Sequence, residues 1–297
     1  MSAPLRVAAF VVLVVVAFGA AAGIGRAVGP LDTAAEPVHA MDDGHADHGA
    51  AAEQLPAGLQ TSVAGHTLAL VDDRLPAGRQ ELALTITGPD GEPVTAYDVQ
   101  HEKQLHLIVV RRDLTGYQHV HPELDPATGV WTTDVRLTPG AWRVFADVAP
   151  TGAGPMVLGT DLMVPGEFRP RPLGPEDRIA NVGSYQVVLN GSLVTGETAL
   201  TLTVSRDGRP VTDLQPYLGA FGHLVALRDG DLAYLHVHPD AEPLPGEVGG
   251  PDVVFHATFP SAGRYRMFLD FRHHAAVRTA VLTVDVTGAG EAAGHEH

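Results

Sequence analysis

The sequence predicts an all-β protein in which two tandem, homologous antiparallel β-sandwiches follow an N-terminal apolar segment. Three observations support this class. Short apolar or alternating runs, bounded by glycine and proline, recur from about residue 60 without a sustained helical period. Motifs of the first half of the chain return in the second half, which indicates an internal repeat. One long uncharged apolar run lies close to the N-terminus.

The short runs predict the strands of the first sandwich. Runs of this length between turn residues are typical of a β-sandwich or a small barrel. A proline-rich break at 165–175 then separates a second series, which extends from residue 185 to residue 286. The predicted strands of the first series are 67–71, 81–87, 105–110, 130–137, 142–148 and 159–164.

The internal repeat is visible in three motifs. Two of them recur 117 residues further on, and the third recurs after a six-residue insertion in the second copy. Agreement in both order and spacing indicates duplication of one structural unit. The motifs are His-Leu before an apolar run ending in Arg at 106–111 and 223–228, Tyr-x-His-Val-His-Pro at 117–122 and 234–239, and Gly-x-[Trp/Tyr]-Arg-x-Phe-x-Asp at 140–147 and 263–270.

These patterns divide the chain into six segments. Composition separates the periodic parts from those rich in Pro, Gly and Ala. We expect a signal peptide or membrane anchor at 1–30, a flexible tether rich in His and Asp at 31–56, the first sandwich at 57–166, a Pro-rich linker at 167–181, the second sandwich at 182–288 and a His-containing tail at 289–297.

The apolar run at 7–24 predicts export. Its length falls between that of a signal-peptide core and that of a full membrane span. The alanines at 20–22 offer a cleavage site, whereas Arg26 and Pro30 suit the outer end of an uncleaved anchor. We therefore expect an extracytoplasmic protein, in the cell envelope or secreted, and the length of the run favours a membrane anchor at 7–24 over a cleaved signal peptide.

Composition narrows the chemistry that is available. A formal charge of −16 and a pI near 5.3 oppose binding to nucleic acid. There are no cysteines, which excludes disulfides, thiolate nucleophiles and cysteine metal sites. With 16 histidines in the chain, any metal would be held by His, Asp, Glu or Met. The sequence indicates no particular protein partner.

An Asp-Gly pair in the second copy predicts how two of its strands align. Such a pair between apolar runs favours a two-residue hairpin loop, here Asp229 and Gly230. Counting outward from that loop places His223 directly across from His236, with their Cβ atoms about 5 Å apart. His238 would lie on the same face, within about 8 Å. Three imidazoles are therefore predicted to converge.

The same strand pairing can be predicted for the first copy. A loop at 112–113 would oppose His106 to His119, with His121 beside them. Pro122 cannot donate to a sheet and would end the strand directly after the last histidine. We therefore expect each group of three to lie near an end of its sandwich, open to water or to a fourth ligand. The competing interpretation is that these histidines bond backbone carbonyls in the ordinary way of half-buried residues.

Three neutral imidazoles on paired strands can bind Cu(II) or Zn(II) at about 2.0 Å. Copper is expected, because nitrogen ligands in an oxidising compartment bind Cu(II) most tightly among the first-row divalent ions. No methionine-rich run is present that would hold Cu(I). The predicted ligands are His106, His119, His121, His223, His236 and His238.

Other side chains are candidates for an additional role. Asp147 and Asp270 could serve as fourth ligands, although ion pairs with Arg143 and Arg266, four residues earlier in the same runs, are favoured. A histidine-rich tract is compositional evidence for metal capture, and its alternative is a solvated acidic linker. The candidates in the tether and tail are His39, His45, His48, His295 and His297.

The three motifs together resemble those of secreted bacterial proteins of the immunoglobulin-like or cupredoxin-like sandwich type that are associated with periplasmic copper handling. The resemblance implies copper sequestration or delivery on the six repeated histidines. It covers both repeats in architecture, and its motifs are short. The methionine-rich copper loop of several such families is missing from this sequence.

Two other functions remain open. One is a metal-free structural or adhesive module of the envelope, since sandwich folds host many binding roles. The other is a cupin-type metal-dependent oxygenase, because the spacing of Gly230, His236, His238, Glu242 and Gly249 fits the first cupin motif. The second cupin motif is absent, and the first copy breaks the match.

Overall fold

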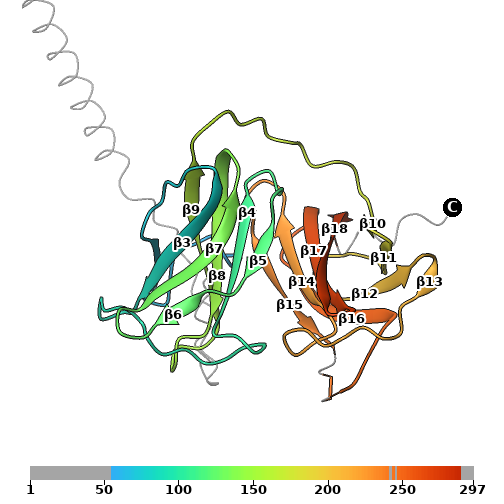
Figure 1. Cartoon of the computed structure of the whole chain (residues 1–297). Coiled ribbons are helices and arrows are strands. Elements are labelled where there is room, and N and C mark those ends of the chain that lie inside the picture. Colours follow the sequence, from blue (N-terminus) through green and yellow to red (C-terminus); the bar gives the residue numbers. More distant parts are fainter. Residues whose placement is uncertain (1–54, 241–242, 245, 289–297) are drawn as a thin grey trace, which may run out of the picture. The chain divides into compact units, whose positions relative to one another are not determined.

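The computed structural model describes residues 55–240, 243–244 and 246–288, apart from the side chains of His236 and His238. All regular structure in these residues is β-strand, which confirms the all-β class (Figure 1). The predicted anchor or signal segment, the tether up to residue 54 and the tail from residue 289 lie outside the described residues. Among the residues that are described, no helix has the length and apolarity needed to cross a bilayer.

The first half of the described chain forms two antiparallel sheets. Their orders are β1-β2-β3-β7-β6 and β5-β4-β8-β9 (Figure 1). Each of the six predicted runs coincides with one of these strands. The bounds are β1 Ser62–Val63, β2 His66–Leu70, β3 Gly78–Thr87, β4 Leu105–Arg111, β5 Gln118–Val120, β6 Glu123–Asp125, β7 Val130–Leu137, β8 Gly140–Val148 and β9 Met156–Val164.

One apolar core lies between these two sheets. From Leu82 onward every second side chain of β3 is buried, as expected for a strand with one face toward a core. Leu84 of β3 and Leu107 of β4 belong to the same buried cluster, with Trp131 and Trp142 as its largest members. The first half is therefore a β-sandwich, and it presents the outer face of each sheet to its surroundings.

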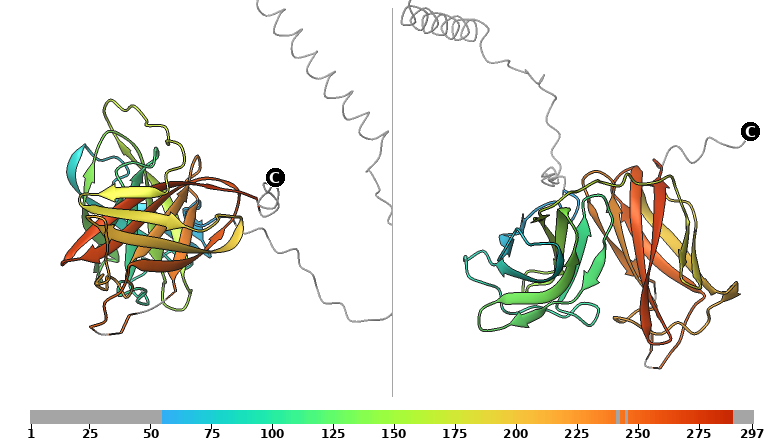
Figure 2. Two further views of the ribbon diagram at one scale, coloured as in Figure 1. Left: turned by 90° about the vertical axis from the view of Figure 1, so that its right-hand side faces the viewer. Right: turned by 45° about the horizontal axis from the view of Figure 1, so that its top comes forward.

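The second half continues the pattern with a longer, connected set of strands. Their order is β10-β11-β12-β16-β15-β14-β17-β18, with β13 paired to β12. The long pair β17 and β18 lies at the red end of the colour scale in Figure 2. The bounds are β10 Ile179–Val182, β11 Tyr185–Asn190, β12 Gly196–Arg206, β13 Arg209–Pro210, β14 His223–Arg228, β15 Tyr234–Pro239, β16 Asp252–Phe259, β17 Gly263–His273 and β18 Ala276–Val286.

A proline marks where the two halves differ. In the first half β5 ends before Pro122, and β6 begins after it in the other sheet. In the second half β15 runs through to Pro239 and pairs with both β14 and β16. The two sheets of the second half are thus joined at one side, and a separate buried cluster that includes Phe255 and Tyr265 lies between them.

A third apolar cluster lies between the two halves. β4 and β14 are buried along nearly their whole length, because each has one face toward its own core and one toward the other half. This explains why both strands are continuous apolar runs rather than alternating ones. The members of the third cluster are Ile108, Val110, Leu114, Phe145 and Val157 from the first half and Val225, Leu227, Leu232, Tyr234 and Phe268 from the second.

Candidate metal centre

The predicted hairpin register is wrong by two residues in both halves. β4 and β5 pair with Ile108 opposite His119, and β14 and β15 pair with Val225 opposite His236. Continuing the first register places His106 level with His121 rather than with His119. Because side chains alternate between faces with a period of two, a shift of two residues leaves all three histidines on one face.

The loops are longer than predicted because each one buries a leucine. In the second half, Leu232 has a left-handed backbone with φ of 64° and is fully buried in the cluster between the halves. Its amide donates to the Arg228 carbonyl over 3.0 Å, and the Arg228 amide donates to the Ala233 carbonyl over 3.1 Å. Leu114 repeats this conformation in the first half, with φ of 60°. Burial of a leucine therefore outweighs the preference of Asp-Gly for a two-residue loop.

The structure brings His106, His119 and His121 together. Their ring centroids are 5.4 Å (His106–His119), 5.0 Å (His106–His121) and 4.9 Å (His119–His121) apart. One nitrogen of each can be chosen so that all three lie within 4.8 Å of one another. Imidazoles that share one ion at about 2.0 Å and near-tetrahedral angles would have centroids about 5 Å apart. The group therefore has the dimensions of a three-histidine metal site.

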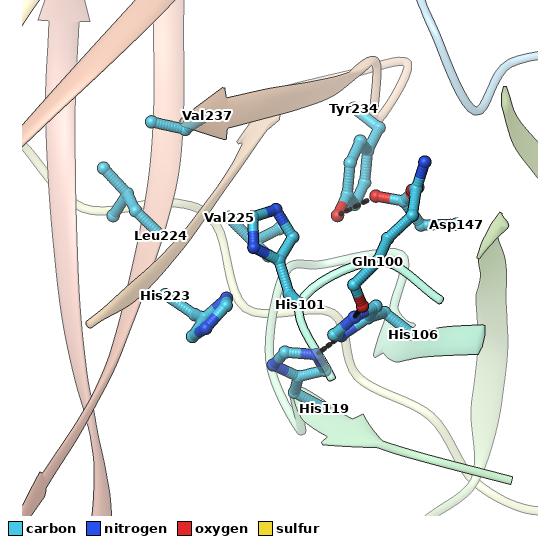
Figure 3. Close-up of a pocket in the computed structure, with 10 residues that line it drawn as sticks. All are labelled: Gln100, His101, His106, His119, Asp147, His223, Leu224, Val225, Tyr234 and Val237. Carbon is cyan, nitrogen blue, oxygen red and sulfur yellow. Dashed lines mark hydrogen bonds between the residues drawn. The ribbon is translucent and has the colours of Figure 1, made fainter. Parts of the chain in front are cut away.

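Hydrogen bonds orient two of these rings toward each other. His106 donates from Nε2 to the Gln100 carbonyl over 3.0 Å, and His119 donates from Nδ1 to Asp270 Oδ2 over 2.9 Å (the first of these bonds is dashed in Figure 3). In the neutral rings the other nitrogens, His106 Nδ1 and His119 Nε2, then carry lone pairs. These two atoms are 3.1 Å apart. A proton or a metal ion must lie between them, and two bonds of about 2.0 Å would enclose an angle of about 100°.

The third histidine has a nitrogen without a partner. His121 Nε2 is buried and makes no hydrogen bond to any described residue. A buried polar atom in this state costs free energy, which binding of an ion would recover. Burial, together with the neighbouring His119 and His106, lowers the pKa of His121 to about 3. Burial is also the main cause that lowers the pKa of His106 to about 4. Both rings are therefore neutral near pH 7, as metal ligands must be.

The site lies on the outer face of its sheet, where β4 begins and β5 ends, as expected for a position near a sandwich end, but it is closed to solvent and not open as predicted. His119 shares a face with Ile108, which packs into the cluster between the halves. That contact excludes most solvent, so that His106 is only 7% exposed. β5 ends at Val120, before Pro122, and the chain continues into β6 of the other sheet.

His223 of the second half lies beside this group. Its ring centroid is 6.2 Å from those of His106 and of His119. Its Nε2 donates to the carbonyls of Tyr217 and Leu218, both over 3.0 Å. Burial is the main cause that lowers the pKa of His223 to about 3. Its Nδ1 therefore carries a lone pair at neutral pH.

The remaining predicted ligands of the second half are described only in their backbone. His236 and His238 occupy the same register positions on β15 as His119 and His121 have in the first half. Their side chains lie outside the described residues, as do Glu242 of the cupin-like motif and His39, His45, His48, His295 and His297. A second three-histidine site therefore stays a prediction.

The predicted ion pairs of the two aspartates are wrong. Arg143 binds Asp161 and the carbonyls of Gly58 and Leu59, and Arg266 donates to a threonine of β18. Four residues along a strand span about 13 Å, so the spacing used in the prediction suits a helix rather than a strand. Asp270 instead accepts from His119 and from Thr279. Asp147 accepts from Tyr234 across the halves, over 3.4 Å.

His101 is a neighbour of the site that the sequence did not identify. Its ring centroid is 5.4 Å from that of His223 and 6.1 Å from that of His106. It lies in a tight turn with a left-handed φ of 46°. The aligned residue in the other repeat is Leu218, so neither periodicity nor repetition marked it. A cavity of about 30 Å³, large enough for one ion or one or two waters, is lined by these histidines (Figure 3).

A second group of candidate ligands, in the second half, is already satisfied by hydrogen bonds. His273 contacts the Tyr185 hydroxyl through Nδ1 over 2.7 Å and Asp213 through Nε2 over 2.9 Å. His274 lies next to it on the surface. With both nitrogens of His273 engaged, this group offers no buried free lone pair and is a structural network.

The described residues form an all-β protein of antiparallel sheets with two buried cores, and a histidine cluster lies where its two halves meet. The chain belongs to the family described as a domain of unknown function, DUF8832, whose family model matches residues 61–157 and 180–288. That description assigns no activity, so the resemblance to copper-handling proteins remains a prediction. No curated protein matches the chain.

Several solved structures are similar in part. Yersinia pseudotuberculosis InvD is 14% identical over 77% of this chain, with a TM-score of 0.25. Escherichia coli alpha-2-macroglobulin activated by porcine elastase is 13% identical over 75% of this chain, with a TM-score of 0.25. A putative membrane-anchored protein from Corynebacterium diphtheriae is 11% identical over 76%, with 0.23. The matches cover 59%, 20% and 59% of those chains, so this chain spans less than two thirds of their length.

Proposed function

We propose that this protein binds Cu(II) outside the cytoplasm through His106, His119 and His121, and that it sequesters or delivers the ion. The single observation that supports this most is the set of three nitrogens. Two lone pairs face each other at 3.1 Å, and the third nitrogen, His121 Nε2, is buried without a partner among the described residues. Ordinary core histidines satisfy their nitrogens, whereas metal ligands leave one for the ion.

The donor set favours copper over other ions. All three donors are imidazole nitrogens, and the chain has no cysteine that would select Zn(II) or Cu(I) by a thiolate. Cu(II) binds such nitrogen sites more tightly than Zn(II) does. An extracytoplasmic location is supported by the apolar run at 7–24, which suits a signal peptide or a membrane anchor.

A direct titration tests this function. The full chain, purified in detergent with the five tether and tail histidines replaced by alanine, is titrated with Cu(II) and Zn(II) against a competing chelator. We expect tight copper binding that is lost in His119→Ala and in His121→Ala. His256→Ala is the matched control, because His256 is exposed and, among the described side chains, its ring pairs with Asp240 at the surface. Equal copper affinity in all three variants would contradict the proposal.

One observation favours a second candidate, a metal-free structural or adhesive envelope module. A proton between His106 and His119 would complete a hydrogen-bonded chain from the Gln100 carbonyl to Asp270, which would hold the halves together without an ion. The large apolar cluster between the halves fits this role as well. Absence of binding at micromolar copper, in a protein whose unfolding is unaffected by chelator, would favour this candidate.

A further inference from the structure

We infer, on the basis of the metal site proposed above, that the second half completes this site. His223 supplies a fourth imidazole, and Asp270 is a positioning residue that fixes the ring of His119. The ion would then bind between the halves and tie them together, in place of a separate ion held within the first sandwich alone.

The contact with Asp270 has the form of a support for a metal ligand. Metal-binding histidines commonly donate their second N–H to a carboxylate, which fixes the tautomer and makes the ring a better donor. Asp270 accepts the Nδ1 proton of His119, and both side chains are nearly fully buried. Thr279 donates to the other oxygen of Asp270 and so fixes the carboxylate in turn. The two members of this pair come from different halves of the chain.

His223 lies close enough to become a fourth ligand when an ion binds. Its Nε2 is occupied by backbone carbonyls, so Nδ1 is the nitrogen left for an ion. Its ring centroid is 6.2 Å from those of His106 and His119, about 1 Å more than the separation of about 5 Å between neighbouring rings on one ion. The nitrogens that already lie within 4.8 Å of one another are those of His106, His119 and His121, so the His223 ring has to move by about 1 Å toward the cavity to bind the same ion. The cavity of about 30 Å³ is bordered by the rings of His106, His119 and His223.

The internal repeat explains why equivalent histidines meet. His106 and His223 occupy the same position in the two copies, and their rings are stacked with planes 22° apart. The aromatic contacts around them are reciprocal, with Tyr117 on Phe268 and Tyr234 beside Phe145. Each half therefore presents the same face to the other. His106 and His223 lie close to the approximate two-fold axis that relates these faces.

The test compares two variants in the full chain with tether and tail histidines replaced. Asp270→Asn should weaken copper binding 10- to 100-fold, the range for loss of such a supporting group. His223→Gln should weaken it further, while its amide keeps a donor for the two carbonyls. The nitrogen splitting in the electron paramagnetic resonance spectrum should change from four nitrogens to three in His223→Gln. Asp285→Asn, at a half-exposed pair with Arg264, is the control.

The outcomes separate the inference from the proposed function. If His119→Ala abolishes binding while His223→Gln leaves affinity and spectrum unchanged, the fourth ligand is overturned and the copper site stands. If two ions bind and His223→Gln removes only one, His223 serves a separate site and the inference is wrong. If no variant binds copper differently from the parent chain, both fail. Circular dichroism and the melting temperature identify any variant that has lost its fold. If Asp270→Asn has lost it, Asp270→Glu replaces it in the test, and this variant, which keeps the carboxylate, should retain part of the copper affinity.

Discussion

Tyr117 of the first half lies flat on Phe268 of the second, with ring centroids 3.9 Å apart and planes within 5° of parallel. Phe268 shares its face of β17 with Asp270, two residues further on, and is only 1% exposed. Aromatic pairs in such contact contribute beyond the area they bury. This stacked pair therefore connects the packing between the halves to the candidate site.

Replacing Phe268 should affect both stability and metal binding. Phe268→Ala is expected to lower the free energy of unfolding by about 3–5 kcal/mol, measured by urea denaturation. Phe271→Ala is the matched control, because Phe271 is equally buried but belongs to the core of the second half. Both variants should lose stability, and only Phe268→Ala should also weaken copper binding. Equal copper affinities in the two would show that the site does not depend on the contact between halves.

Copper itself should stabilise the fold if the proposed site exists. An ion that binds only the native state adds about 2.7 kcal/mol at a free concentration 100 times its dissociation constant. We expect a higher melting temperature with copper, reversed by chelator and absent in His121→Ala. A rise of the same size in His121→Ala would place the binding elsewhere in the chain.

The loop between β4 and β5 requires a glycine at position 116. Gly116 has a left-handed φ of 69°, and a Cβ there would lie 2.6 Å from the Trp142 ring. Gly116→Ala is therefore expected to cost about 2–4 kcal/mol, from backbone strain and from a clash with a buried ring. Gly91 also has a left-handed φ, of 83°, but nothing lies within 4 Å of its Cβ position. Gly91→Ala should cost only about 1 kcal/mol. If thermal denaturation showed similar losses of stability in the two variants, the clash with Trp142 would be excluded as the cause.

Asp113 should make stability depend on acid pH. Burial alone would raise the pKa of Asp113, but hydrogen bonds from Arg111, Thr115 and the Arg171 amide outweigh it and lower this pKa to about 2. In the unfolded chain the pKa of this carboxyl returns to about 3.9. The carboxylate therefore stabilises the fold above about pH 4, and this contribution is lost as the pH falls toward 2.

The corresponding variant is Asp113→Asn. At pH 7 it should be less stable than the parent chain by about 1–3 kcal/mol, since charged hydrogen bonds are removed. That difference should shrink when unfolding is followed from pH 5 down to pH 2. Asp134→Asn serves as the comparison, because Asp134 pairs with Arg79 at an exposed position. A difference that stays constant over this pH range would mean that the charge of Asp113 contributes nothing.

The sequence by itself determined the local structure. Short apolar or alternating runs located six of the nine strands of the first half, and repetition of the motifs located β14, β15 and β17 of the second. It also determined that His106, His119 and His121 share a face. This last prediction survived a register error of two residues, because side-chain direction along a strand depends only on whether the separation is odd or even.

Only the tertiary structure decided what lies opposite that face. His119 and Asp270 are 151 residues apart, and no local pattern connects them. Their contact depends on two outer sheet faces burying Ile108, Val225 and the surrounding aromatic rings against each other. The apolar runs of β4 and β14 indicate burial on both sides, but not which surface covers them. The packing of one half on the other therefore placed Asp270, His223 and His101 at the site.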